Sequence, residues 1–278
     1  MPAVYAHLRF GEEVVKSLPP IYSSLIEKYP EAFALGTQGP DILFYHQPFK
    51  ANELKTQGTY FHTLSGAEFF RPQAEKLLAN GGETAEEILE KNGAYAAYIL
   101  GFLCHFTLDV QCHPYIDKRT FEALSHSKLE SELDKALLRQ DGLPIRGYNT
   151  ATPILDRNGV KEAVSKALDA PEENISLAIK TMRNINGLFS YSSEPFHFLA
   201  HLVLKIIKMD RQFGDMFLHK KDDPLCVETN QVLVELWKEG IPKAVELIKD
   251  YFENLHSFAQ SGALQNELFR CDFGGVKK

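Results

Sequence analysis

Apolar residues recur every three to four positions through most of the chain, and convincing alternation with a period of two is hard to find. A repeat near 3.6 residues places apolar side chains on one face of a helix. The pattern therefore predicts an all-α protein. The expected helices cover residues 3–16, 20–35, 58–79, 84–91, 93–111, 120–140, 154–168, 171–187, 194–215 and 226–254.

Proline and glycine divide this pattern. Pro19 and Pro20 separate the first two expected helices. Pro114 is expected to stop the helix that begins near residue 93, because proline lacks the N–H of the helical hydrogen bond. Gly240 and Pro242 are expected to kink or split the last long helix.

The longest connection in the middle of the chain runs from residue 142 to residue 153. A chain of 278 residues can bury one large core, so a single domain over residues 1–278 is expected. In this interpretation residues 1–140 carry the chemistry, and the helices between residues 154 and 254 support them.

The charge balance bears on the class of partner. Lys and Arg number 30 against 37 Asp and Glu, which gives a formal net charge of −7. Such a surface lacks the positive field of a non-specific nucleic-acid binder. No stable nucleic-acid partner is expected.

Neither a signal peptide nor a transmembrane helix is expected. Residues 1–16 are amphipathic and lack the apolar core of a signal sequence. The longest apolar run, residues 94–104, is too short to cross a bilayer. Four cysteines, at positions 104, 112, 226 and 271, form no Cys-x-x-Cys pair, which favours reduced thiols. A cytoplasmic protein is therefore expected.

Five potential metal ligands fall within 26 residues: His105, Asp109, His113, His126 and Glu130. Two pairs, His105/Asp109 and His126/Glu130, are spaced i, i+4, which puts both side chains on one helix face. An imidazole and a carboxylate at that separation can bind one ion, and zinc accepts this mixture. Two such pairs predict two metal ions side by side, an arrangement suited to phosphate-ester displacement.

Three further candidates lie upstream: His7, Asp41 after a Gly-Pro turn, and His62 near the start of an expected helix. Each has an ordinary explanation by itself. A lone helical histidine is usually a packing or surface residue, and an aspartate after a turn usually caps a helix. Their order along the chain, together with the five residues above, favours a functional role.

This ordered series resembles the bacterial zinc-dependent phospholipase C family, whose helical fold is shared with P1/S1-type nucleases. The matching positions are His7, Gly39-Pro40-Asp41, His62, the segment from Gly101 to Asp109, His113-Pro114, and His126 with Glu130. They cover the first half of the chain, and no motif follows residue 140. The resemblance implies a multi-helix phospholipase C/P1 nuclease-like bundle with a metal cluster between its helices.

The resemblance also implies the role of each residue in the first half of the site. His62, His105 and Asp109 are similar to the ligands of a first zinc ion. Asp41 resembles a residue close to that ion, as a ligand or as the general base.

The second half of the site follows from the same resemblance. His113, His126 and Glu130 are similar to the ligands of a second zinc ion. His7 resembles the histidine that helps to hold a third zinc, with Asp109 as a bridge between ions.

The chain also departs from the family's pattern. Family members complete the third site with an amino-terminal tryptophan, whereas the only tryptophan here is Trp237. A third site at His7 would then bind its ion weakly, be completed by water, or be filled by another ion. The aromatic positions that bind choline in secreted members are not recognisable, and Ile42 follows Asp41.

The ligand types suit phosphodiester hydrolysis. A phosphodiester is anionic and resists attack by water. Clustered cations neutralise its oxygens and lower the pKa of water, and Asp41 could orient that water or take its proton. The sequence predicts a zinc-dependent phosphodiester hydrolase that acts on a phospholipid or a smaller phosphoester, with transient contact to a membrane surface.

Two alternatives stay open. A nuclease or nucleotidase on the same scaffold would need a base-stacking aromatic residue and a basic groove near the metals. A metal-stabilised binding domain without turnover is the other. The retention of two ligand sets argues against it, because structural zinc is usually closed and rich in cysteine.

Other histidines and cysteines have simpler explanations. His197 and His201 are spaced i, i+4, but no glutamate follows His197, as a His-Glu-x-x-His zinc motif requires. Their apolar neighbours favour a buried amphipathic helix. Cys104 and Cys112 each precede a candidate histidine and point away from it on a helix, so core packing is the better interpretation.

Overall fold

The computed structural model describes residues 3–278 except 121–123, 192, 207–212 and 262–265. The all-α prediction is confirmed: the described residues form helices, and their only β-type pairings are two isolated bridges near the C-terminus. The α-helices are α1 Val4–Ser17, α2 Pro20–Lys28, α3 Pro30–Gly36, α4 Glu53–Thr63, α5 Gly66–Leu78, α6 Ala85–Asn92, α7 Ala94–Arg119, α8 His126–Gln140, α9 Val160–Leu168, α10 Glu172–Phe189, α11 Glu194–Ile206, α13 Val227–Glu253 and α14 Leu255–Ser261. Short 3₁₀ helices are η1 Gly39–Tyr45, η2 Gly214–Met216, η3 Pro224–Cys226 and η4 Glu267–Arg270.

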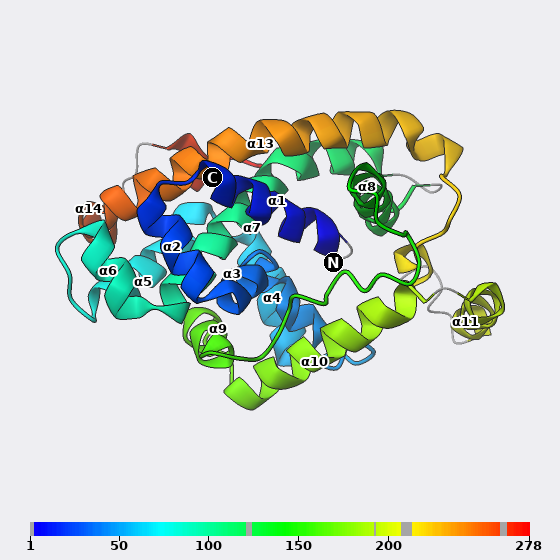
Figure 1. The fold of residues 1–278 in the computed structure, drawn as a ribbon, viewed down its shortest axis with the longest axis horizontal. Helices are drawn as coiled ribbons and strands as arrows, with labels where there is room; N and C mark the ends of the chain where they lie inside the picture. Colours follow the sequence, from blue (N-terminus) through cyan, green and yellow to red (C-terminus); the bar gives the residue numbers. More distant parts are fainter. Residues whose placement is uncertain (1–2, 121–123, 192, 207–212, 262–265) are drawn as a thin grey trace.

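Helix α7 runs through the middle of the molecule, and α1, α3, α9 and α13 pack against it (Figure 1). Its residues from Tyr95 to Val110 are all buried, because this stretch is apolar on every side and such a helix must be covered all round. The few polar groups inside this stretch, His105 and Asp109 among them, are therefore also buried.

Two glycines allow α3 to lie directly on α7. A Cβ atom at Gly36 would lie 2.2 Å from the carbonyl oxygen of Tyr98, and one at Gly101 would lie 2.2 Å from that of Phe33. No larger residue fits at this distance. The close approach brings the segment after α3, which carries Asp41, next to the part of α7 that carries His105.

The prediction that Pro114 ends its helix is wrong. Helix α7 continues through Pro114 to Arg119. Proline removes one hydrogen bond, but Ile116 beyond it is buried, so packing of the last turns offsets that loss. Gly275 lies against the proline ring, where a Cβ atom would be 2.5 Å from Pro114 Cγ. Helix α13 likewise runs unbroken past Pro242.

Several predicted boundaries also move. The helix expected over 20–35 is broken at Tyr29, because Pro30 begins a new helix. The helix expected over 58–79 is two helices, since Ser65 and Glu68 form a capping box that starts α5. His62 therefore lies in the last turn of α4 rather than near a helix start.

Asp41 lies on η1 instead of in a simple turn. Two later boundaries move as well. Helix α8 begins at His126, and α9 begins at Val160. The helix expected over 194–215 is described as far as Ile206, and residues 207–212 lie outside the described residues.

Among the described helices, no single one is long and apolar enough to cross a membrane. Helices α6 and α7 would pass such a test only as a pair, which is bent by 112°.

Candidate metal centre

Three successive turns of α7 each carry a candidate metal ligand on the same face of the helix. His105, Asp109 and His113 follow each other at i, i+4. Asp109 Oδ2 lies 3.1 Å from His105 Nε2, and Asp109 Oδ1 lies 3.5 Å from His113 Nε2. His7 of α1 comes from the opposite side, with its Nε2 atom 3.4 Å from Asp109 Oδ1. Asp109 thus contacts three imidazoles.

At one end of this row lie Asp41 and His62. Asp41 Oδ1 of η1 is 3.1 Å from His62 Nε2 at the end of α4. Together with His105, these two residues form a group whose ligand atoms all lie within 4.8 Å of one another. Gly39 makes room for it: its φ is +50°, and a Cβ atom there would lie 2.2 Å from the His105 ring.

At the other end, α8 supplies the remaining pair. Glu130 Oε1 lies 3.3 Å from His126 Nε2 and 3.7 Å from His113 Nε2. These three residues form another group within 4.8 Å, and His7, His105 and Asp109 form the third. The structure therefore brings all eight predicted ligands into one row. Asp41 rather than Asp109 completes the group with His62 and His105.

In three of the five candidate histidines, the hydrogen bond of Nδ1 determines which ring nitrogen is left to bind a metal ion. Nδ1 lies 3.2 Å from the Thr37 carbonyl oxygen in His105, 2.7 Å from that of Gly58 in His62, and 3.0 Å from that of Phe273 in His113. A carbonyl oxygen only accepts hydrogen bonds, so each Nδ1 must carry the hydrogen. In the neutral ring, Nε2 is then a bare lone pair.

Those lone pairs face carboxylate oxygens, which also only accept. Within the described part of the chain, the buried Nε2 of His105 makes no hydrogen bond, although it lies close to Asp109. Acceptors directed at each other in a buried space repel unless a cation lies between them. Neutral imidazole and carboxylate are the donor set of catalytic zinc sites, with the second nitrogen held by a backbone carbonyl. The residues fit zinc.

The electrostatics of the protein without metal also favour positive charge in the site. Burial opposes ionisation of Asp109, yet the charges of His105 and His113 hold its pKa well below the usual range. Burial likewise opposes protonation of His113, but Asp109 and Glu130 raise its pKa to about 9. His7 differs, because burial and the neighbouring His105 lower its pKa.

A buried aspartate outside this row holds α1 in place. Asp134 of α8 accepts hydrogen bonds from the backbone N–H groups of Ala6, at 2.8 Å, and Tyr5, at 3.3 Å. These are free N–H groups of the first turn of α1, whose own N-cap residue, Ala3, offers no side-chain bond. Asp134 therefore caps α1 from another helix and fixes the position of His7.

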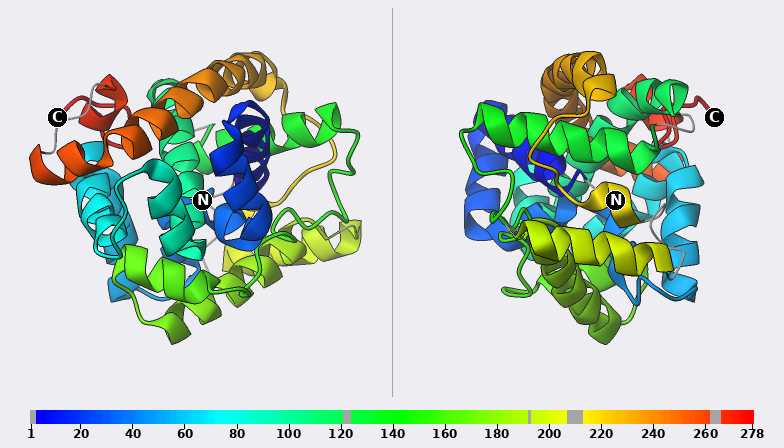
Figure 2. Two further views of the ribbon diagram at one scale, coloured as in Figure 1. Left: turned by 60° about the vertical axis from the view of Figure 1, so that its left-hand side comes forward. Right: turned by 90° about the vertical axis from the view of Figure 1, so that its right-hand side faces the viewer.

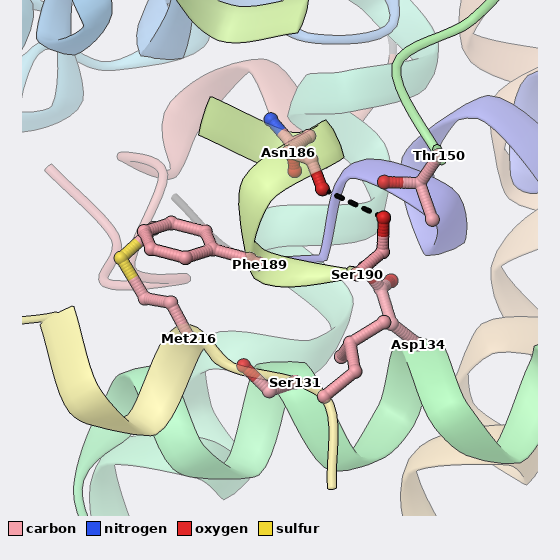
Figure 3. A pocket seen from close by; sticks show the side chains of 8 residues that line it. Ser131, Asp134, Thr150, Asn186, Phe189, Ser190 and Met216 are labelled. Carbon is pink, nitrogen blue, oxygen red and sulfur yellow. Dashed lines mark hydrogen bonds between the residues drawn. The ribbon is translucent and has the colours of Figure 1, made fainter. Parts of the chain in front are cut away.

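The Asp134 side chain also lines a small pocket between α8 and α10. Figure 3 shows Asp134 and Ser131 of α8 facing Thr150, Asn186 and Ser190 across it. The Ser190 hydroxyl donates to the Asn186 carbonyl oxygen at 2.9 Å.

Sequence reasoning did not identify the residues that orient the ligands. The carbonyl oxygens of Thr37, Gly58 and Phe273 hold three histidines. Carbonyl groups occur in every residue, so no sequence signal marks them. Gly39 was visible as part of the Gly-Pro-Asp motif, and its positive φ is the physical reason for glycine there.

His197 and His201 lie elsewhere, on α11. The His201 ring is stacked on that of His219 with centroids 5.4 Å apart, and neither α11 histidine belongs to a metal-type group among the residues that the structure describes. Cys104 and Cys112 are buried free thiols, in agreement with core packing.

Comparison with known proteins gives one match. The family model described as zinc dependent phospholipase C matches residues 6–182, a segment that contains all eight ligand positions. No curated protein and no solved structure matches the sequence. Helices α11, α13 and α14 lie outside the matched segment.

Proposed function

Because the chain belongs to the zinc-dependent phospholipase C family, it is a metal-dependent phosphoric ester hydrolase, and we propose that its substrate is a phospholipid whose phosphodiester it cleaves with water. The observation that carries this proposal is the row of buried imidazole and carboxylate groups whose acceptor atoms face one another. This row demands cations, and the eight residues that form it all fall within the matched segment.

We propose two principal zinc sites and a third between them. Asp41, His62 and His105 would hold one ion. His113, His126 and Glu130 would hold another. When bound, the ions supply positive charge for the phosphate oxygens and an acidified water.

His7 and Asp109 would hold the third, and Asp109 would bridge. Asp109 contacts His105 and His113, which belong to different groups. This position supports the bridging role.

Asp41 is the carboxylate that substrate can reach. Its side chain is 14% exposed, against 4% for Asp109 and 6% for Glu130. Nearby His62 holds the pKa of Asp41 below its usual range, although burial opposes this. Asp41 is therefore ionised at neutral pH. From its end of the row it can orient a water molecule or take its proton.

The test compares Asp41→Asn with the parent enzyme. We expect turnover of a nitrophenyl phosphocholine ester to fall at least about a hundredfold, the size typical of losing a general base, while most of the zinc remains. Asp156→Asn, on the exposed loop before α9, is the control and should retain full activity. Loss of zinc in proportion to activity would make Asp41 a ligand and not a base.

Single-stranded DNA and a nucleoside monophosphate, assayed in parallel, separate this function from its alternatives. Cleavage of DNA but not of the phosphocholine ester would favour a nuclease. Zinc bound without turnover of any substrate would favour a binding domain.

We also propose that residues 1–278 form one domain and that the protein is cytoplasmic. Packing of α9 and α13 on α7 supports a single domain over residues 1–278. Four buried, free cysteines support a reducing compartment such as the cytoplasm.

A further inference from the structure

Helix α11 is apolar on two opposite sides. Phe196, Ala200 and Leu204 pack inward on a small core formed by Phe189, Phe213, Met216 and Phe217. The residues two positions further on point outward: Phe198 is 74% exposed, Leu202 45% and Ile206 71%. Phe198 and Ile206 are the two most exposed large apolar side chains among the described residues. A soluble helix normally has polar residues on its outer side. The outward side of α11 is therefore unusual.

The exposed apolar area is larger than this one helix side. Leu199 and Val203 of α11 and Leu188 of α10 are also about half exposed, and they line an apolar groove between the two helices. Figure 1 shows α11 at the edge of the molecule, and the right panel of Figure 2 shows it lying across the face turned to the viewer. Contiguous exposed apolar surface of this kind marks an interaction site.

The groove leads towards the metal centre. Phe49 lines the groove, and the centroid of its ring lies 5.1 Å from that of Phe213. Phe49 also lines a shallow pocket together with Phe44. The Phe44 ring in turn lies 5.7 Å from the ring of His62. Apolar side chains thus connect the α11 surface with a candidate zinc ligand.

The continuous apolar surface from α11 to His62 indicates what kind of partner covers it. Whatever covers α11 and Phe49 lies next to the end of the site that carries His62 and its partner Asp41. A bound protein there would keep a phosphodiester away from Asp41, whereas a lipid surface would bring phosphodiester groups to it. Lys50 and Lys55 line the same shallow pocket as Phe44 and Phe49, at the place where a phosphate layer would lie above apolar chains.

The length of α11 determines how it can meet a lipid layer. The 13 residues over which α11 is described extend about 20 Å at 1.5 Å per residue, and no single described helix is long and apolar enough to cross a hydrocarbon core of about 30 Å. A helix of this size lies in the plane of the interface with one side in the acyl region.

We propose that the outward side of α11, with Phe49, is the surface by which the enzyme docks on a phospholipid bilayer. The docked orientation turns the end of the metal site that carries Asp41 and His62 towards the head groups. The proposal rests on the proposed phospholipid substrate. With a net charge of −7, the chain would dock through apolar contact on zwitterionic lipid and not through attraction to anionic lipid.

The experiment uses zinc-loaded protein and phosphatidylcholine vesicles in a flotation assay. The variant is Phe198→Ser/Ile206→Ser, which changes two exposed side chains and no ligand. We expect vesicle binding and vesicle hydrolysis to fall at least about tenfold, since two large apolar side chains lose their burial. Turnover of the water-soluble nitrophenyl phosphocholine ester should stay unchanged, and high salt should not release the parent protein.

Val276→Ser is the matched control, because this residue is 59% exposed and belongs to the C-terminal segment, away from α11 (Figure 1). It should bind vesicles like the parent.

Absence of vesicle binding by the parent, or equal loss of soluble and vesicle activity in the double variant, would overturn the proposal. So would a dimer in light scattering that the double variant dissociates without any effect on vesicles. Docking that depends on Phe198 and Ile206 in a protein that cleaves no phosphoester would instead refute the proposed function and retain the docking surface.

Discussion

Asp109 is the residue with the most contacts to other candidate ligands. It lies between His7, His105 and His113, with carboxylate oxygens 3.1 to 3.5 Å from their Nε2 atoms. Glu130 contacts two imidazoles, both in the group at the other end of the row. The two carboxylates should therefore differ in how many ions they hold.

We expect Asp109→Asn to lose zinc from more than one site and Glu130→Gln to lose about one ion. An amide cannot supply the negative charge that offsets a buried cation. Elemental analysis after dialysis measures this, with Glu246→Gln on the exposed side of α13 as the control. Equal losses of one ion in the two variants would contradict a bridging Asp109.

Among the elements, helix α8 both supplies metal ligands and holds the N-terminus of α1. Its first turns supply His126 and Glu130, and one turn later Asp134 caps the N-terminus of α1. Burial raises the pKa of Asp134 to about 7 against an ordinary value of 3.8, although the two backbone N–H groups favour the charged form. The contribution of this contact between α8 and α1 to the unfolding free energy should then depend on pH.

A carboxyl group with a raised pKa in the folded state stabilises that state most below about pH 4. The stability is lost as pH rises towards 7, because the unfolded chain releases a proton that the folded chain retains. Asp134→Asn keeps an acceptor oxygen and does not titrate. Relative to this variant, the parent should lose more than about 1 kcal/mol of unfolding free energy from pH 5 to pH 8, since one pKa unit corresponds to about 1.4 kcal/mol.

Urea unfolding of the zinc-free proteins at these two pH values provides the measurement. Asp156→Asn, which alters an exposed carboxylate, should have the same unfolding free energy as the parent at both pH values. A difference between Asp134→Asn and the parent that stays the same at both pH values would show that Asp134 does not titrate in this range.

In the whole molecule, the metal centre joins helices that are far apart in the chain. α1, η1, α4, α7 and α8 each contribute at least one of the eight groups. Three of those groups, Asp41, Asp109 and Glu130, are carboxylates that lie along this one row of ligands. Bound cations should therefore stabilise the packing of these helices as well as take part in catalysis.

Removal of zinc with a chelator should lower the melting temperature by at least about 8 °C, because ligand at a thousand times its dissociation constant adds about 4 kcal/mol. Calorimetry with and without re-added zinc tests this. Asp109→Asn should respond less to the chelator than the parent does. A melting temperature that stays constant while elemental analysis shows the zinc removed would contradict the expectation.

The sequence by itself determined the helical class and the two ligand pairs within helices. These follow from local geometry: a 3.6-residue repeat fixes the fold class, and i, i+4 spacing puts His105 beside Asp109 and His126 beside Glu130. The order of the motif also pointed to His7, Asp41 and His62, but their meeting depends on packing of α1 and α3 against α7 and of α4 against η1.

Tertiary structure decided the rest. Packing carries α7 past Pro114, which places His113 on the same helix as His105. The C-terminal tail, which follows the last helix expected from the sequence, supplies the Phe273 carbonyl group that orients His113. The exposure of α11 was also hidden in the sequence, since an apolar helix pattern predicts burial. Only the position of neighbouring elements shows that one side of α11 is covered and the other is open.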